Sequence, residues 1–171
     1  DGSGAGNSTA TAVLSFAAIT DVNDDPDATA NVYTIVEDTA SLSGSLIADD
    51  TGAGSDGYVD GDAVTVTSFT IPGQGGPFAL GLAYTIVTSG PSGPVTVGDL
   101  TVNGDGTFSF APVVDYNSTG FGDGGVPQIF YTIGDGVGGS ATATLDITVT
   151  PVNDAPVAVA DSASGTEDGG A

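Results

Sequence analysis

The 171-residue chain contains no lysine, arginine or histidine, and it also lacks cysteine, methionine and tryptophan. Without cysteine it has neither a disulfide nor a thiolate metal site, and without histidine it has no imidazole base and no usual zinc or copper ligand. Without lysine it cannot form a Schiff base or an intramolecular lysine–asparagine isopeptide bond. The ligands that remain are carboxylate, amide, hydroxyl and backbone oxygens.

The acidic residues have no basic partners. The chain carries 22 aspartates and glutamates, which give it a formal net charge of -22 at pH 7. Carboxylates held close together repel, so a cluster of them needs either open water or a cation from outside the chain. The same sign of charge disfavours nucleic acid, anionic membranes and phosphate ligands as partners. Because hard oxygen ligands suit calcium, Ca²⁺ is the cofactor that the composition favours.

No apolar run approaches the roughly 18 residues of a membrane-spanning helix. No methionine or signal-like segment opens the chain, so we expect it to be a piece of a longer protein.

Glycine and proline, 28 and 9 residues respectively, interrupt short hydrophobic stretches throughout the chain, as is typical of strands joined by tight turns. The clearest strand is 140–150, where apolar residues alternate with threonine and aspartate. The alternation of apolar and polar residues slips between Val66 and Phe69, which predicts a β-bulge there. The predicted strands are 30–36, 42–48, 63–71, 80–87, 95–102, one containing Phe108 and Phe110, 129–133 and 140–150.

This pattern predicts an all-β fold, an antiparallel Ig-like β-sandwich of about seven to eight strands. Strand 80–87 breaks the up-and-down order of a seven-strand sandwich. It is therefore expected to be an edge insertion or a crossover between sheets.

Two landmarks repeat at one spacing. Val22-Asn23-Asp24 returns as Val152-Asn153-Asp154, and Glu37-Asp38 returns as Glu167-Asp168, each 130 positions later. This predicts a tandem repeat. Residues 1–23 would be the last strand of a preceding repeat, 24–154 a complete repeat, and 155–171 the first strand of the following one.

In a seven-strand sandwich, the acidic loops sort to the two ends. The predicted ligands at the entry junction, where the chain enters the domain, are Asp21, Asn23, Asp24, Asp60, Asp62 and Asp135. Those at the exit junction are Glu37, Asp115, Asn153 and Asp154. Repulsion makes both groupings unfavourable without metal, and the six to eight oxygens that calcium takes would make them favourable.

Five motifs in order resemble the cadherin-like tandem repeats of RTX-type bacterial surface adhesins. They are Glu-Asp-Thr at 37–39, Asp-Gly-Thr-Phe-Ser-Phe at 105–110, Asp-Tyr-Asn at 115–117, Asp-Gly-Val-Gly-Gly at 135–139 and Val-Asn-Asp-Ala-Pro at 152–156. The resemblance implies a secreted, extracellular or cell-surface β-sandwich with calcium at its junctions and a mechanical or adhesive role. Pro151 and Ala155 replace acidic residues of the linker pattern, so the exit junction is expected to hold fewer or weaker ions than the entry.

We therefore expect a spacer in a long surface protein or fibre, with adjacent repeats of the same chain or identical subunits as partners. Two alternatives remain open. One is a ligand-binding adhesin module in which the long insertion at 72–93, or the loop 116–127, grips a glycan, peptide or surface. The other is a filament subunit assembled by β-strand exchange. An enzyme is not expected, because paired carboxylates such as Asp60 and Asp62 have no tryptophan, arginine or histidine to assist them.

The remaining acidic residues have simpler interpretations. Asp105 is predicted to be a turn residue of Asn103-Gly104-Asp105-Gly106. Asp49, Asp50 and Asp56 either extend a metal site or, as is commoner in loops, are solvated.

Overall fold

The computed structural model describes residues 22–48, 56–57, 61–118, 125–156 and 158–162. Within these residues the chain forms nine strands and no helix. The strands are β1 (Asn31–Val36), β2 (Leu42–Ser45), β3 (Thr65–Ile71), β4 (Gly75–Phe78), β5 (Ala83–Gly90), β6 (Gly93–Val102), β7 (Thr107–Pro112), β8 (Ile129–Gly134) and β9 (Ser140–Thr150). No helix of the described part is long and apolar enough to cross a membrane.

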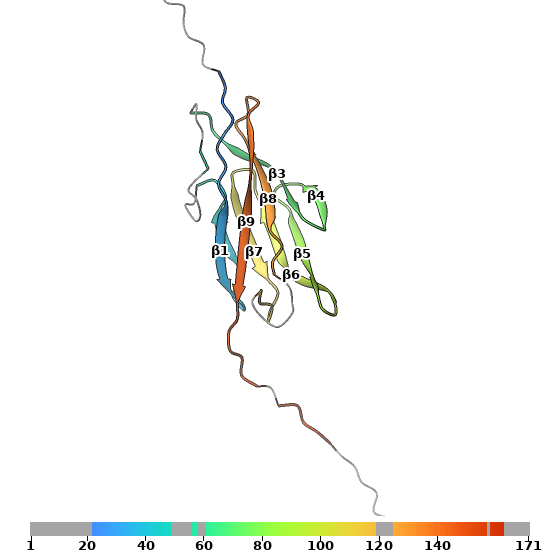
Figure 1. Cartoon of the computed structure of the whole chain (residues 1–171). Coiled ribbons are helices and arrows are strands. Elements are labelled where there is room, and N and C mark those ends of the chain that lie inside the picture. The colour runs from blue at the N-terminus through green and yellow to red at the C-terminus, as the bar shows by residue number, and fades with distance from the viewer. Residues whose placement is uncertain (1–21, 49–55, 58–60, 119–124, 157, 163–171) are drawn as a thin grey trace, which may run out of the picture.

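The strands form two sheets packed face to face. One sheet has the order β1-β9-β8-β3-β4 and the other the order β2-β7-β6-β5. The predicted all-β sandwich is thus confirmed (Figure 1). The register of β3 against β8 shifts between Val66 and Ser68, where the sequence predicts a bulge.

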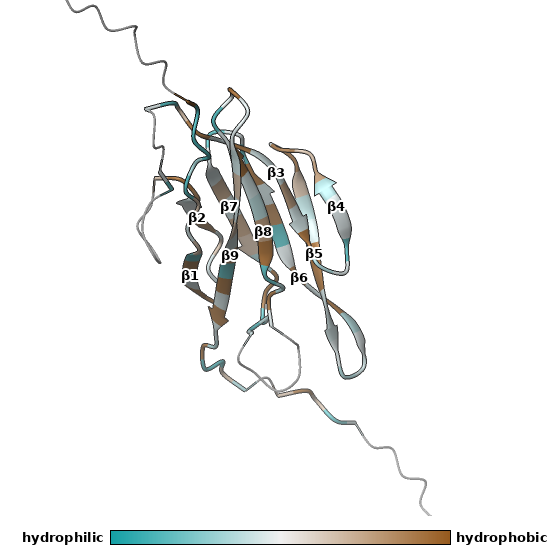
Figure 2. Ribbon diagram, turned by 45° about the horizontal axis from the view of Figure 1, so that its top comes forward, coloured by the Kyte–Doolittle hydropathy of each residue, from teal (hydrophilic) through white to brown (hydrophobic). Residues whose placement is uncertain are grey.

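The core lies between the two sheets and is built by the alternation of each strand. In β9, Ala143, Leu145, Ile147 and Val149 are buried, as their spacing predicts. Figure 2 shows the hydrophobic residues in bands along the strands. The largest wholly covered side chains are Tyr131, Phe69, Phe110, Leu46, Ile71, Ile86, Leu100, Ile129, Ile133 and Leu145. Burying aliphatic and aromatic side chains of this size contributes about 1.5–3 kcal/mol each, which makes this interior the main source of stability.

One strand pair is not antiparallel. β1 runs parallel to β9, with Asn31 opposite Leu145 and Val36 opposite Thr150, whereas every other pair within the described strands is antiparallel. Because β1 opens the domain and β9 closes it in the same direction, the chain enters at one end and leaves at the other (Figure 1). The two junctions therefore lie at opposite ends of the molecule.

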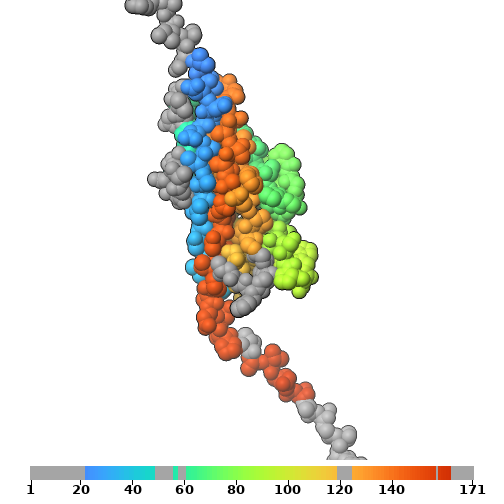
Figure 3. All heavy atoms as spheres, viewed as in Figure 1, coloured from blue at the N-terminus to red at the C-terminus, as the bar shows by residue number. Residues whose placement is uncertain are grey.

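The insertion between β3 and β6 is both an edge insertion and a crossover. Residues 72–77, which lie outside the predicted strands, include most of the short edge strand β4, which pairs with β3. The chain then crosses to the other sheet, where β5 pairs with β6 and is the edge strand on the same side of the sandwich as β4. The strand expected at 80–87 lies at Ala83–Gly90 instead. In Figure 3 these green segments lie on the side of the molecule away from β1.

The predicted neighbouring repeats remain predictions. Most of 1–23, expected to be the last strand of a preceding repeat, lies outside the described residues, as does 163–171. Residues 151–156 and 158–162 are exposed and belong to no strand.

Candidate metal centre

Three carboxylates meet where the chain leaves the sandwich. Asp38 follows β1, Asp115 lies in the loop after β7, and Asp154 lies in the linker after β9. One carboxylate oxygen from each lies within 4.8 Å of those of the other two, and all three side chains are exposed. This is the one group of three or more such side chains in the described part of the chain. We call it the exit cluster.

The backbone at the exit cluster adopts an uncommon conformation. Asp38 and Asp115 have φ values of 65° and 62°, and they are the two described residues other than glycine with positive φ. Aspartate tolerates this left-handed region better than most residues do. The Asp115 N–H donates a hydrogen bond to Asp38 Oδ1 at 3.3 Å. The two loops are thereby held face to face.

Glu37 fixes the linker to the domain. Its side chain is only 4% exposed, its Oε1 accepts a hydrogen bond from the Val152 N–H at 2.6 Å, and its Oε2 accepts one from Asn117 Nδ2 at 3.3 Å. A buried carboxylate is costly unless it is paired. Since the chain has no basic side chain, hydrogen bonds and an external cation are the means of compensation.

The loop that carries Asp115 and Asn117 is anchored to β9. Tyr116 is buried, and the Ser118 N–H donates to the Val149 carbonyl at 2.9 Å. The Val149 N–H in turn donates to Ser118 Oγ at 2.8 Å. The polar groups of this loop are therefore positioned by packing and by the sheet.

The residues at this end fit a calcium ion. Asn117 Oδ1 is buried and has no hydrogen-bond partner, beside Glu37 and in the same loop as Asp115. An amide oxygen without a donor is a free ligand atom for a cation. The donors are all oxygens, of the carboxylate and amide types that calcium prefers.

The electrostatics of the cluster also favour a cation. Partial desolvation raises the pKa of the Asp154 carboxyl, and the negative charges of Asp38, Asp115 and Glu37 raise it further. The ionised form of Asp154 is therefore disfavoured while its neighbours are ionised. A divalent cation among these oxygens removes that penalty.

Some of the residues predicted for the exit junction lie in this cluster. The structure brings Asp115 and Asp154 together and places Glu37 beside them, whereas Asn153 is exposed and makes no hydrogen bond to them within the described residues. Asp38 and Asn117 were not among the predicted ligands. The signals were present: Asp38 belongs to the repeated Glu-Asp pair, and Asn117 ends the Asp-Tyr-Asn motif.

At the entry end, Asp135 organises the turn between β8 and β9. Its Oδ1 accepts hydrogen bonds from the backbone N–H groups of residues 137, 138 and 139 at 2.9–3.0 Å, and its Oδ2 accepts one from Asn23 Nδ2 at 2.9 Å. The Asn23 bond and these backbone bonds hold the pKa of Asp135 below its usual value. The predicted meeting of Asn23 with Asp135 is therefore observed.

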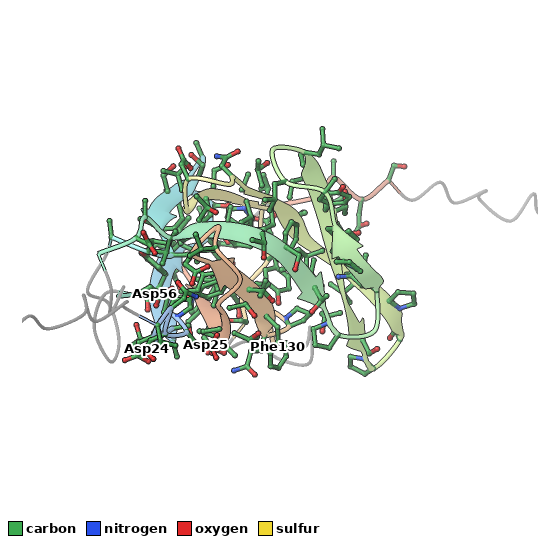
Figure 4. The ribbon with its side chains drawn as sticks, turned by 90° about the horizontal axis from the view of Figure 1, so that it is seen from above. Asp24, Asp25, Asp56 and Phe130 are labelled. Carbon is green, nitrogen blue, oxygen red and sulfur yellow. The ribbon has the colours of Figure 1, made fainter. Side chains whose placement is uncertain are left out.

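Further contacts attach the incoming chain to this end. Asp25 Oδ1 accepts a hydrogen bond from the Ser140 N–H at 3.2 Å, and Asp24 and Asp25 lie side by side when the molecule is viewed from above (Figure 4). Asp62 makes no hydrogen bond to Asn23 or Asp135 in the described part. Asp21 and Asp60 lie outside the described residues. That the entry junction holds more ions than the exit stays a prediction.

Asp56 is neither a metal ligand of the exit cluster nor a solvated loop acid. It is 6% exposed, and it accepts hydrogen bonds from the Thr29 N–H, from Thr29 Oγ1 and from the Tyr131 hydroxyl at 2.6, 3.0 and 3.0 Å. The sequence does not reveal this role of Asp56, because Thr29 and Tyr131 are far away along the chain. Asp105 behaves as predicted: it is exposed, and it accepts hydrogen bonds from the backbone N–H and hydroxyl of Thr107 in the β6–β7 turn.

Comparison with known proteins agrees with this architecture. A search of curated proteins found no match. The family profile described as the cadherin-like domain matches residues 22–150, three quarters of the chain and all nine strands of the sandwich. The chain therefore belongs to the cadherin-like domain family.

Proposed function

We propose that this chain is a calcium-stiffened spacer of a long extracellular adhesive protein. Cadherin-like domains are typically extracellular modules with structural or adhesive roles, are not enzymes, and generally bind calcium. The proposal adds where calcium binds in this chain and what it does there.

One observation carries the proposal. The three carboxylates of the exit cluster come from two loops of the domain and from the linker that leaves it, next to a buried amide oxygen without a partner. Asp38, Asp115 and Asp154 would hold the ion, with Asn117 Oδ1 and Glu37 adjacent. Because Asp154 belongs to the linker, an ion shared by these residues would join the linker to the domain.

The negative charges of the exit cluster explain why calcium would stiffen the joint between the linker and the domain. Without a cation, the linker carboxylate is repelled by the two domain carboxylates, which favours orientations that separate them. Calcium bound to all three favours the orientation that brings them together, and ligand binding shifts the population accordingly. Extracellular calcium modules bind with dissociation constants of about 10⁻⁴–10⁻³ M, so such a joint would be rigid outside a cell and slack inside it.

The proposed setting is a tandem array on a bacterial surface. Support comes from the ordered motifs that resemble RTX adhesin repeats, from the spacing of 130 residues between like landmarks, and from junctions at opposite ends of the domain. The partners in this proposal are adjacent repeats of the same chain or identical subunits.

Thermal unfolding of the chain in calcium chloride and in EDTA tests the proposal. We expect calcium to raise the melting temperature by several degrees, because it binds the folded state alone. Asp115→Asn removes one ligand charge and keeps a side chain that tolerates positive φ, so it should shrink the calcium-induced rise. Asp99→Asn, an equal charge change at an exposed residue of β6, should not. Equal melting temperatures with and without calcium would refute the proposal.

A further inference from the structure

A pocket of about 690 Å³ opens at the edge of the sandwich, where the β3–β4 turn faces β5 and the β5–β6 hairpin. It lies in the insertion, and none of its lining residues belongs to the exit cluster. Pockets of about 300–1,000 Å³ are the usual size for small-molecule sites. The pocket is therefore large enough for a ligand of one or two sugar rings.

Gln74 gives this pocket an unsatisfied hydrogen-bond donor. Its Oε1 accepts a hydrogen bond from the Val87 N–H at 2.7 Å, which distinguishes the oxygen of the amide from its nitrogen. Its Nε2 is buried and has no partner. A buried donor left unpaired is unfavourable, so a ligand that supplies an acceptor oxygen gains from pairing with it. Since Gln74 lines the pocket, pairing with a ligand requires its side chain to turn the buried Nε2 toward the opening.

The rest of the lining is uncharged and mixed in character. The lining residues include three prolines, Pro72, Pro94 and Pro127, and two residues with hydroxyl groups, Thr88 and Ser89. A hydroxyl can both donate and accept a hydrogen bond. A sugar ring has a matching division into C–H faces and hydroxyl edges. No basic residue exists in the chain, and its net charge of -22 repels anions, so a neutral ligand is favoured over an acidic one.

An added peptide strand fits this edge less well. β5 is the edge strand of its sheet, and strand addition needs its free backbone groups. The Val87 N–H is already bonded to Gln74, and the register of β5 against β6 shifts between Ile86 and Val87. A compact ligand is thus better matched to the site than an extended one.

From these observations we propose that the pocket between the β3–β4 turn and β5 binds a neutral saccharide of one or two rings. The saccharide's hydroxyl oxygens pair with Gln74 Nε2 and the Thr88 hydroxyl, and its C–H face packs on the proline rings. The binding does not depend on the exit cluster.

Amide NMR of the whole chain tests this site with four probes: galactose, lactose, N-acetylglucosamine and galacturonate. We expect saturable shifts of the Val87 amide and the Gln74 side-chain NH₂ with at least one neutral probe, in calcium and in EDTA alike. Galacturonate, the acidic counterpart of galactose, should bind more weakly. If calcium did not stabilise the chain but sugars still shifted these NMR signals, the result would count against the spacer function alone.

Variants separate binding from folding. Gln74→Glu keeps the acceptor for the Val87 N–H and removes the donor, so we expect about a tenfold loss of affinity with an unchanged amide spectrum elsewhere. Thr88→Val should also weaken binding. Thr96→Val should not, because Thr96 lies in the neighbouring strand β6 and outside the pocket. Absence of saturable shifts with all neutral probes, shifts that fall outside the pocket, or affinity that survives Gln74→Glu would overturn the proposal.

Discussion

At the residue scale, a buried polar network joins Asp56, which lies between β2 and β3, to the start of β1. The Tyr131 hydroxyl accepts a hydrogen bond from Asn31 Nδ2 at 2.8 Å and lies within bonding distance of Asp56 Oδ2, the Thr29 carbonyl and the Leu46 carbonyl. Burial, and then the negative charge of Asp56, raise the pKa of this hydroxyl, so it stays protonated and available as a donor.

Tyr131→Phe should destabilise the fold. The substitution leaves Asn31 Nδ2 and Asp56 Oδ2 each short of a buried partner, and an unsatisfied buried group costs about 1–3 kcal/mol. Urea unfolding measures the loss. Tyr84→Phe is the matched control, because its hydroxyl bonds the exposed Ala79 N–H, where water can substitute. Equal losses for the two variants would mean that the network adds nothing.

Asp56 should also give stability a pH dependence. Burial raises the pKa of Asp56 above its ordinary value of 3.8, although hydrogen bonds from Thr29 and Tyr131 oppose the shift. The folded state therefore binds this proton more tightly than the unfolded state does. The resulting stabilisation is complete below pH 3.8 and is lost as the pH rises through the folded-state pKa.

The comparison to make is between the wild-type chain and Asp56→Asn in EDTA, by urea unfolding at a series of pH values. The asparagine cannot ionise, so the wild-type free energy of unfolding should fall relative to that of the variant as the pH rises. A difference that stays constant over the acidic range would show that Asp56 has the same pKa in both states.

At the element scale, local patterns predicted the strands that bury one face. The alternation in β9 and the Asn-Gly-Asp-Gly turn before β7 each specify their structure within about ten residues, through side-chain period and turn geometry. The short strand β4 was missed because Gly75-Gly76-Pro77 carries no alternation and pairs only at an edge. The parallel pairing of β1 with β9 could not be predicted from the sequence either, since the residue pattern of a strand does not determine which strand it pairs with.

The close approach of β6 and β7 makes a further prediction. Gly98 in β6 is buried opposite Pro112, and a Cβ there would lie 2.8 Å from Pro112 Cα and still closer to the Ala111 carbonyl oxygen. These are backbone atoms that cannot move aside. Gly98→Ala should therefore cost at least about 1–3 kcal/mol of stability, measured by urea unfolding.

Gly125→Ala provides the control for this contact. A Cβ at residue 125 meets no atom within 4 Å, and its backbone does not need the left-handed region. Its unfolding midpoint should stay close to that of the wild-type chain. If Gly98→Ala were as stable as this control, the two strands would have to lie further apart than the structure places them.

At the scale of the whole molecule, the sequence predicted that carboxylates gather at two ends, because strands alternate in direction. It did not predict which oxygens meet. Asp38 and Asp115 face each other through left-handed backbone conformations, and Asn117 Oδ1 is buried in a loop that is anchored to β9. Both features depend on tertiary packing. Carboxylates without a basic partner thus gather at the ends of the domain, where neighbouring modules would join.

The most direct test is a crystal structure of the chain grown with calcium chloride, with anomalous scattering measured to identify the metal. The account predicts one anomalous peak at the exit cluster, with oxygens of Asp38, Asp115 and Asp154 at about 2.3–2.6 Å from the ion. Density for water alone among these side chains, in a correctly folded domain with its linker held in place, would contradict it.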